Sequence, residues 1–286
     1  MNLYYLGLYE KALPEELSWE CKLETAATYG FDGIELSIDE SDKRLSRLSE
    51  TCSEVKDIKR AMNDTGLPIR TMCLSGHRRF PFGSHDRNTR ERARQILQSA
   101  VLLASALGIR IIQLAGYDVY YENHDEETEQ WFLDGIEHAA NFAASYGVAL
   151  GFETMETAFM DTVEKAMAIA KKINSPYLGL YPDIGNLKNA AELYQGDVVE
   201  DLRLGTGHIW AAHLKETRTG TYRDMRIGNG HTEYEKSLQE LWNQGVRMFV
   251  GEFWYHDGDD YANTIQNAAV FLRKKIANRC SLPRVD

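Results

Sequence analysis

The sequence has few cysteines, and none of them stand close together. Its 286 residues include four, with no CxxC pair: Cys21, Cys52, Cys73 and Cys280. A disulfide framework is typical of short, cysteine-dense secreted chains, whereas this chain is long and has few cysteines. We therefore expect free thiols in a reducing cytoplasm.

Long apolar runs are also missing. The first residues, MNLYYLGLYEK, contain no basic segment followed by a long apolar one. No run approaches the roughly 18 apolar residues that indicate a membrane-spanning helix. We expect a soluble, cytoplasmic protein that has no contact with a membrane.

Positive charge is in deficit. There are 32 Lys and Arg residues against 43 Asp and Glu residues, which gives a net charge of -11 at pH 7. Such a balance argues against a nucleic-acid partner or an anionic membrane surface. Any anionic ligand would need a local basic pocket.

Two kinds of sequence landmark are absent as well. The chain contains no GxGxxG or P-loop pattern to support the rival open, doubly wound sheet, and no Pro/Gly/Ser-rich linker that would separate domains. With 43% hydrophobic residues, it can bury one large core. We expect a single domain over residues 1–286.

One local pattern recurs along the chain: a helix-like segment ends at glycine, and an apolar strand-like run follows at once. It occurs in YGFDGIEL (29–36), TGLPIRTMCLS (65–75), LGIRIIQLAG (107–116) and YGVALGFETM (146–155), and NQGVRMFVGEF (243–253) offers a fifth copy. The first four glycines are 36, 42 and 39 residues apart and suit left-handed helix caps: Gly30, Gly66, Gly108 and Gly147.

Three further apolar runs complete a set of eight predicted strands: LYYLGLY (3–9), YLGLYPD (177–183) and HIWAAHLK (208–215). Amphipathic helical segments lie between strands, for example over residues 90–107 and 161–173. Alternating strands and helices favour parallel pairing, and eight units in about 250 residues match a (β/α)8 TIM barrel, an α/β fold.

Polar side chains follow the last four predicted strands. In a barrel, active sites lie at the carboxyl ends of the strands. Alternation along the fifth run places Glu153 on the same face as the small residues Ala149 and Gly151, as expected for an inward side chain. The residues at the four strand ends are Glu153, Asp183, His213 with Lys215, and Glu252.

Three carboxylates and an imidazole at one barrel mouth predict a metal site. Like charges repel unless a cation lies among them, and this donor set suits one divalent ion: Mn²⁺, Mg²⁺, Co²⁺ or Zn²⁺. Taken singly, a strand-end carboxylate such as Asp183 can be a helix cap, and His213 can be a hydrogen-bonded core residue. Their joint occurrence at four consecutive strand ends favours the metal.

A basic patch, CLSGHRRFPFGS, follows the third predicted strand. Placed at the mouth, it is a candidate phosphate site, although a surface loop with solvated arginines is an equally open interpretation. The predicted substrate contacts are Ser75, His77, Arg78, Lys215 and Arg226.

The chain resembles the L-ribulose-5-phosphate (L-xylulose-5-phosphate) 3-epimerases of the xylose isomerase-like barrels. The matching stretches run in order along nearly the whole chain: YEKALP from Tyr9, LSGHRRFPFGS from Leu74, IQLAGYDVYY from Ile112, LYPDIGN from Leu180, GHIWAAHLKET from Gly207 and GEFW from Gly251. One departure is Glu216, where an aspartate commonly follows the HxK motif.

The resemblance implies a metal-dependent 3-epimerase acting on a phosphorylated ketose, and a homodimer. It implies that Glu153, Asp183, His213 and Glu252 bind one divalent metal ion and that Glu153 and Glu252 are the acid/base pair. Two bases suit proton transfer at C3 of L-ribulose 5-phosphate and L-xylulose 5-phosphate.

Three other functions remain open from the sequence. An aldose–ketose isomerase, such as a hexulose-6-phosphate isomerase, would use the same metal on C1 and C2. A non-catalytic sugar-phosphate-binding protein would share the pocket without turnover. A metal-dependent nuclease shares the barrel but needs several metals and many histidines, and the acidic chain has eight scattered ones.

Overall fold

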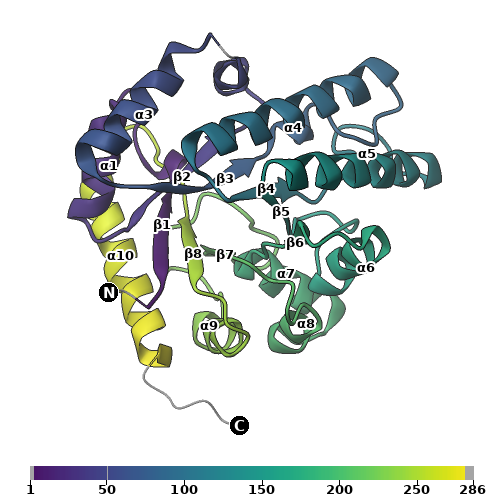
Figure 1. Cartoon of the computed structure of the whole chain (residues 1–286). Coiled ribbons are helices and arrows are strands. Elements are labelled where there is room, and N and C mark those ends of the chain that lie inside the picture. The colour runs from purple at the N-terminus through teal and green to yellow at the C-terminus, as the bar shows by residue number, and fades with distance from the viewer. Residues whose placement is uncertain (1–2, 50, 281–286) are drawn as a thin grey trace.

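The computed structural model, which describes residues 3–49 and 51–280, is a barrel of eight parallel strands with helices outside it (Figure 1). The predicted (β/α)8 class is thereby confirmed. The strands are β1 (Tyr5–Tyr9), β2 (Gly33–Ile38), β3 (Ile69–Leu74), β4 (Ile111–Ala115), β5 (Ala149–Glu153), β6 (Leu178–Leu180), β7 (Ala212–Lys215) and β8 (Met248–Glu252).

Seven of the eight strand junctions are parallel ladders, in the order β6-β5-β4-β3-β2-β1-β8-β7. The eighth junction, between β6 and β7, is closed by two isolated parallel bridges, Leu180 with Ile209 and Asp183 with His213. The main-chain N–H of His213 donates to the carbonyl of Pro182 over 3.0 Å. This closure draws two predicted metal ligands together.

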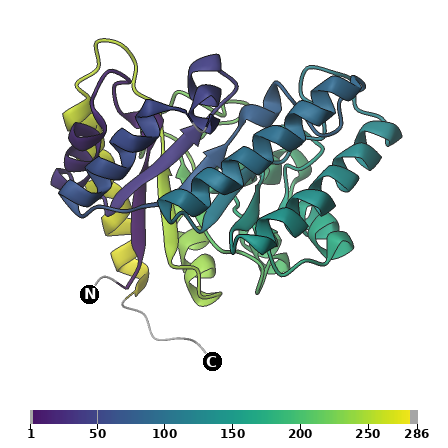
Figure 2. The same ribbon diagram turned by 45° about the horizontal axis from the view of Figure 1, so that its top comes forward.

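The helices form the outer layer, and α4 and α5 lie side by side (Figure 2). No helix among residues 3–49 and 51–280 is long and apolar enough to cross a membrane. The longer helices are α1 (Trp19–Thr28), α3 (Ser53–Thr65), α4 (Arg87–Leu107), α5 (Glu126–Ser145), α6 (Val163–Ile173), α7 (Ile184–Tyr194), α9 (Tyr234–Asn243) and α10 (Tyr261–Cys280). Shorter helical segments are η1 (Glu10–Ala12), α2 (Asp42–Leu45), η2 (Ser46–Leu48), η3 (Gly76–Arg78) and α8 (Val198–Leu204).

The recurring glycines end helices as the sequence predicts. Gly66 and Gly108 cap α3 and α4 with φ of 69° and 74°, in the left-handed region that glycine adopts without strain. Gly30 and Gly147 have φ of 95° and 65°, one residue after the caps of α1 and α5. Each glycine therefore turns the chain from a helix into the next strand.

The core has two parts, which follow from alternation along the strands. Leu150 and Phe152 of β5 face the helices, whereas Ala149 packs inside the barrel. The interior is crowded: a Cβ on Gly179 would lie 2.6 Å from the carbonyl oxygen of His208. Small residues low in the barrel thus leave room for polar residues at its mouth.

A buried ionic network fixes the carboxyl ends of β1 and β2. Glu10 is fully buried, and its carboxylate lies 2.8 Å from Arg47 and 2.7 Å from Arg44. It also accepts a hydrogen bond of 3.0 Å from the main-chain N–H of Ser37, in β2. The next residue, Lys11, lines the cavity at the barrel mouth, so this network positions one wall of that cavity.

Glu10→Gln is expected to lower the free energy of unfolding by about 3–5 kcal/mol, because it leaves buried guanidinium groups unpaired. Burial opposes ionisation, but Arg44 and Arg47 outweigh it and lower the pKa of Glu10 to about 2. The stabilisation is therefore complete above pH about 4.5 and lost as the pH falls towards 2.

Urea unfolding of both proteins across this pH range measures the effect. The control is Asp57→Asn, which breaks an exposed ion pair with Arg60 and should change stability by less than about 1 kcal/mol. Equal stability of the Glu10→Gln variant and the parent at pH 7 would contradict this account.

Candidate active site

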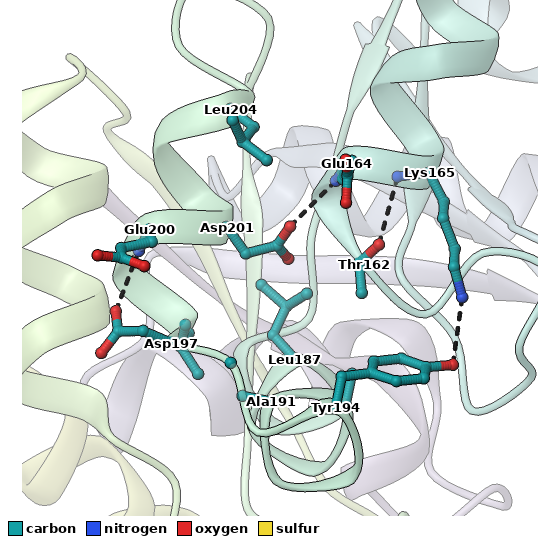
Figure 3. Close-up of a pocket in the computed structure, with 13 residues that line it drawn as sticks. Thr162, Glu164, Lys165, Leu187, Ala191, Tyr194, Asp197, Glu200, Asp201 and Leu204 are labelled. Atoms are coloured by element: carbon teal, nitrogen blue, oxygen red, sulfur yellow. Dashed lines mark hydrogen bonds between the residues drawn. The ribbon is translucent and has the colours of Figure 1, made fainter.

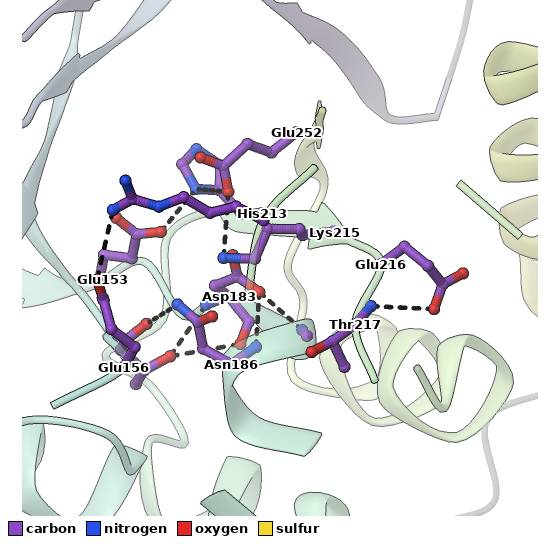
Figure 4. A network of polar contacts seen from close by, with 12 residues as sticks. Glu153, Glu156, Asp183, Asn186, His213, Lys215, Glu216, Thr217 and Glu252 are labelled. Carbon is purple, nitrogen blue, oxygen red and sulfur yellow. Dashed lines mark hydrogen bonds and ion pairs between the residues drawn. The ribbon is translucent and has the colours of Figure 1, made fainter. Parts of the chain in front are cut away.

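The four predicted ligands meet at the carboxyl end of the barrel (Figure 4). Glu153 and Glu252 are the last residues of β5 and β8, and His213 lies within β7. Asp183 follows β6 and begins α7. One donor atom from each residue lies within 4.8 Å of the others.

His213 lies between the two glutamates. Its Nδ1 atom is 3.2 Å from Glu153 Oε1 and 3.4 Å from Glu252 Oε2. The exposed fraction of each side chain is at most 7%. Two carboxylates thus face one imidazole nitrogen in a site that is almost free of solvent.

Asp183 serves the fold and the cluster at once. Its Oδ1 atom accepts hydrogen bonds from the main-chain N–H groups of Gly185 (2.7 Å) and Asn186 (2.9 Å), which caps α7. Its Oδ2 atom faces the cluster and lies 2.7 Å from Lys215 Nζ. The helix-cap and ligand interpretations of this residue are therefore compatible.

The electrostatics of the cluster suit a cation. Burial, with Glu252 adding to it, raises the pKa of Asp183 to about 6, although Lys215 opposes this shift. Burial opposes a charge on His213, but the surrounding carboxylates raise the pKa of its imidazole. Asp183 Oδ2 and Glu252 Oε2 are both buried, and they lie 2.7 Å and 3.7 Å from the ammonium group of Lys215. An oxygen-rich donor set with one nitrogen fits a divalent metal ion.

A fifth carboxylate, Glu35, lies behind His213. Its Oε1 atom is 2.6 Å from His213 Nε2, and its Oε2 atom accepts a 2.8 Å hydrogen bond from the hydroxyl of Tyr181. Because a carboxylate only accepts, Nε2 donates its proton, and Nδ1 is the nitrogen that faces the cluster. Glu35 thereby orients the imidazole so that Nδ1 faces the carboxylates of Glu153 and Glu252.

Gln113 orients Glu153 in a similar way, because its side-chain amide donates to Glu153 Oε2. Both Gln113 and Glu35 are fully buried. The sequence analysis missed them because neither ends a strand. Each is a polar residue on the inward face of an otherwise apolar strand, and this pattern in the sequence could have identified both.

A narrow cavity of about 50 Å³ lies above the cluster. It is lined by three of the predicted substrate contacts: Ser75, Arg78 and Lys215. Burial opposes a charge on Lys215, but Asp183 and Glu252 raise the pKa of its ammonium group, so it is cationic. Lys11 and Arg223, which the sequence analysis did not select, add two further basic side chains.

The structure places the two other predicted contacts outside this cavity. His77 is buried with its Nε2 atom 3.1 Å from the carbonyl oxygen of Ala93, and burial lowers its pKa to about 4. Arg226 is 61% exposed and pairs with Asp259 over 3.0 Å. Neither His77 nor Arg226 lines the cavity in this structure.

Comparison with known proteins identifies the family. The model of the xylose isomerase-like TIM barrel family matches residues 23–275. A protein of Escherichia coli K12 named "Putative L-ribulose-5-phosphate 3-epimerase SgbU" is 45% identical over 263 residues, which cover 89% of this chain and 90% of that protein. The chain belongs to the L-ribulose-5-phosphate 3-epimerase family of these barrels.

Of two further comparisons, the first supports the family and the second supports the fold. The L-ribulose-5-phosphate 3-epimerase UlaE of Escherichia coli strain Crooks is 38% identical over 95% of both chains. The crystal structure of D-allulose 3-epimerase from Methylomonas sp. shares the fold, with a TM-score of 0.76 and 16% identity over 95% of this chain and 97% of that one. Epimerases are isomerases, so the predicted enzyme class is confirmed.

Glu216, the departure from the family pattern, anchors the loop between β7 and α9. Its buried carboxylate accepts hydrogen bonds from the main-chain N–H groups of Gly228 (2.8 Å), Thr232 (3.0 Å) and Thr217 (3.2 Å). A longer side chain than aspartate thus reaches across the base of the loop that carries Arg223.

A larger hollow, of about 560 Å³, lies outside the barrel against α6, α7 and α8 (Figure 3). Leu187, Tyr194 and Leu204 contribute apolar surface, and Glu164 and Asp201 lie at its edge. No group of possible metal ligands was found there among the described residues. We therefore locate the active site in the narrower cavity.

Glu35→Gln is expected to weaken metal affinity about 10- to 100-fold, because loss of the charge makes His213 a poorer ligand. Calorimetric titration of the metal-free protein with Mn²⁺ measures this effect. Tyr181→Phe is the matched control, since it removes only the other hydrogen bond to Glu35 and should weaken affinity less. Unchanged affinity in Glu35→Gln would show that this carboxylate is structural.

Proposed function

We propose that this chain is a divalent-metal-dependent 3-epimerase that interconverts L-ribulose 5-phosphate and L-xylulose 5-phosphate. The observation that carries the proposal is the placement of Glu153 and Glu252 on either side of His213 Nδ1 at the barrel mouth. The names of the two Escherichia coli relatives support the choice of substrate.

Glu153, Asp183, His213 and Glu252 would hold the ion, which is Mn²⁺, Zn²⁺, Co²⁺ or Mg²⁺. The donor set and the two glutamate carboxylates that face one imidazole nitrogen support this assignment. A bound divalent ion supplies Lewis-acid stabilisation of the negative charge that develops on the oxygens of a ketose.

One glutamate removes a proton from C3 of the substrate, and the other glutamate donates a proton to C3. One carboxylate removes the proton from one face of C3, and the electron pair is delocalised into the neighbouring carbonyl to give an enediolate. The other glutamate, in its protonated form, then donates a proton to the opposite face, which inverts C3. In the reverse reaction the two residues exchange roles.

Ser75, Arg78 and Lys215 are the proposed substrate contacts from the predicted set. Arg78 and Lys215 supply the local positive charge that an anionic substrate needs in an acidic chain. The proposed homodimer rests on the family resemblance, and light scattering at several protein concentrations tests it.

The direct test is an assay of the metal-loaded protein. L-Ribulose 5-phosphate and L-xylulose 5-phosphate should interconvert, whereas D-hexulose 6-phosphates should not yield aldoses. Formation of an aldose phosphate would instead favour the isomerase. Binding of these sugars without turnover would favour a binding protein.

Arg78→Ala is expected to raise KM for the phosphorylated ketose about 10- to 100-fold, and to change KM for unphosphorylated L-ribulose far less. The reason is that a hydrogen bond to a charged group contributes about 1.5–3 kcal/mol. Steady-state kinetics with both sugars measure the difference. Equal increases would show that Arg78 does not contact the phosphate.

A further inference from the structure

The cavity at the barrel mouth is too small for the substrate that the proposed function requires. Pockets for small ligands usually measure about 300–1,000 Å³, whereas this one measures about 50 Å³. Glu153 and Glu252 line its floor, and Arg78, Glu156 and Arg223 line it as well. Side chains must therefore move when a sugar phosphate binds.

Glu156, in the loop after β5, is the point on which the cationic side chains converge. Its Oε1 atom lies 3.3 Å from Arg223 and 4.0 Å from Arg78, which come from two different loops. Its Oε2 atom accepts a 2.6 Å hydrogen bond from the hydroxyl of Tyr117. An acidic side chain thus lies among donors that also suit a phosphate.

The Glu156 carboxylate carries a negative charge at neutral pH. Burial opposes ionisation, but the hydrogen bond from Tyr117 and the charges of Arg223 and Arg78 lower the pKa of this carboxyl. The arginines are thus already neutralised in part within the chain. A phosphate must compete with this internal anion.

Arg78 has donors left for a ligand. Its one hydrogen bond to the described residues goes to the hydroxyl of Tyr117 over 3.1 Å, and its buried Nε–H has no acceptor among them. The guanidinium also lies over the ring of Tyr120, with its Cζ atom 4.8 Å from the ring centre, and this contact helps to hold it in place. A guanidinium held in this way is ready to bind an oxyanion.

We propose that Arg78 and Arg223 form the phosphate subsite and that the Glu156 carboxylate occupies this subsite until the phosphate of the substrate displaces it. The inference rests on the proposed function for the identity of the substrate. It assigns a specificity role to Arg223 in place of Arg226, which lies in the same loop but pairs with Asp259 and does not line the cavity.

Removing the charge of Glu156 should change the affinity for phosphate in the opposite direction to removing an arginine. Removing the charge of Glu156 frees both guanidinium groups and should strengthen phosphate binding. An unphosphorylated ketose has no anion to compete for this position. Glu156 therefore sets how strongly the site distinguishes phosphorylated from free sugar.

The test measures binding of inorganic phosphate to the metal-loaded protein by calorimetry, and KM for phosphorylated and free L-ribulose. Glu156→Gln should tighten phosphate binding about three- to tenfold and lower KM for the phosphorylated ketose alone. Arg223→Ala should weaken phosphate binding about tenfold or more. Glu137→Gln, which removes one charge from the exposed surface of α5, should change neither quantity.

Three results would overturn the inference. Weaker or unchanged phosphate binding in Glu156→Gln would show that Glu156 does not compete with the anion. Equal changes in KM for both sugars would make Glu156 a sugar contact. Loss of phosphate binding in Arg226→Ala but not in Arg223→Ala would restore the sequence-based choice. Because phosphate binding needs no turnover, these results stand apart from failure of the epimerase assay.

Discussion

Removal of the divalent ion by a chelator is expected to abolish turnover, and Mn²⁺, Co²⁺ or Zn²⁺ is expected to restore it. The expectation follows from the charge of the site, where Glu153, Asp183 and Glu252 lie together out of solvent. Without the ion, Lys215 is the cationic side chain that pairs with Asp183 and Glu252, and nothing is left to stabilise the negative charge that develops on a ketose. Metal content and turnover, measured on the same samples, test this prediction.

Single substitutions test the requirement for the metal ion residue by residue. His213→Ala and Asp183→Asn should lose bound metal and turnover together, since each removes a ligand. His138→Ala replaces an exposed histidine on α5 and should lose neither. Full activity in a preparation shown to be free of metal would refute the metal assignment.

Replacement of either proposed acid/base residue is the second change with a large expected effect. Glu153→Gln and Glu252→Gln should each reduce kcat by at least about 10³-fold, because one face of C3 then lacks its proton donor or acceptor. Each glutamate is also a proposed ligand, so metal content must be measured alongside kcat. Glu137→Gln on the surface of α5 is the matched control.

A variant that retains its metal and loses turnover would support the acid/base role. Epimerisation at an undiminished rate in either metal-loaded variant would contradict it. The remaining glutamate can still exchange the C3 proton of the one epimer that it faces. Such one-sided exchange would show which epimer Glu153 serves and which Glu252 serves.

The barrel could be predicted from the sequence because the repeating unit of helix, glycine and strand is visible in short stretches of the chain. Each glycine that ends a helix is followed within a few residues by an apolar strand, so Gly66 predicts the start of β3 and Gly108 predicts the start of β4. Alternation along β5 then fixes the inward direction of Glu153. The four strand-end residues were thus predictable without knowledge of any contact.

Contacts across the barrel were not predictable in the same way. Glu35 and His213 are 178 residues apart, and only closure of the sheet brings Glu35 Oε1 to the imidazole. The paths of the loops could not be predicted either, because they depend on buried hydrogen-bonding residues such as Glu216. Arg223 and Arg226 lie three residues apart in one loop, yet only Arg223 lines the cavity.

The sequence also could not decide between two roles for Asp183. An aspartate after β6 suits both the N-cap of α7 and the ligand cluster. The structure shows that the two oxygens divide these tasks, with Oδ1 on the helix and Oδ2 towards Lys215. A residue at the junction of a strand and a helix can therefore satisfy both patterns.

The most direct test of the two-base account is the fate of the proton at C3. L-Ribulose 5-phosphate is converted by the metal-loaded protein in D₂O, and the product is examined by NMR. Because the second glutamate exchanges with solvent before it donates, the account predicts L-xylulose 5-phosphate with deuterium at C3 and none at C1. Deuterium at C1 or C2, with none at C3, would mean that the same site catalyses aldose–ketose isomerisation instead.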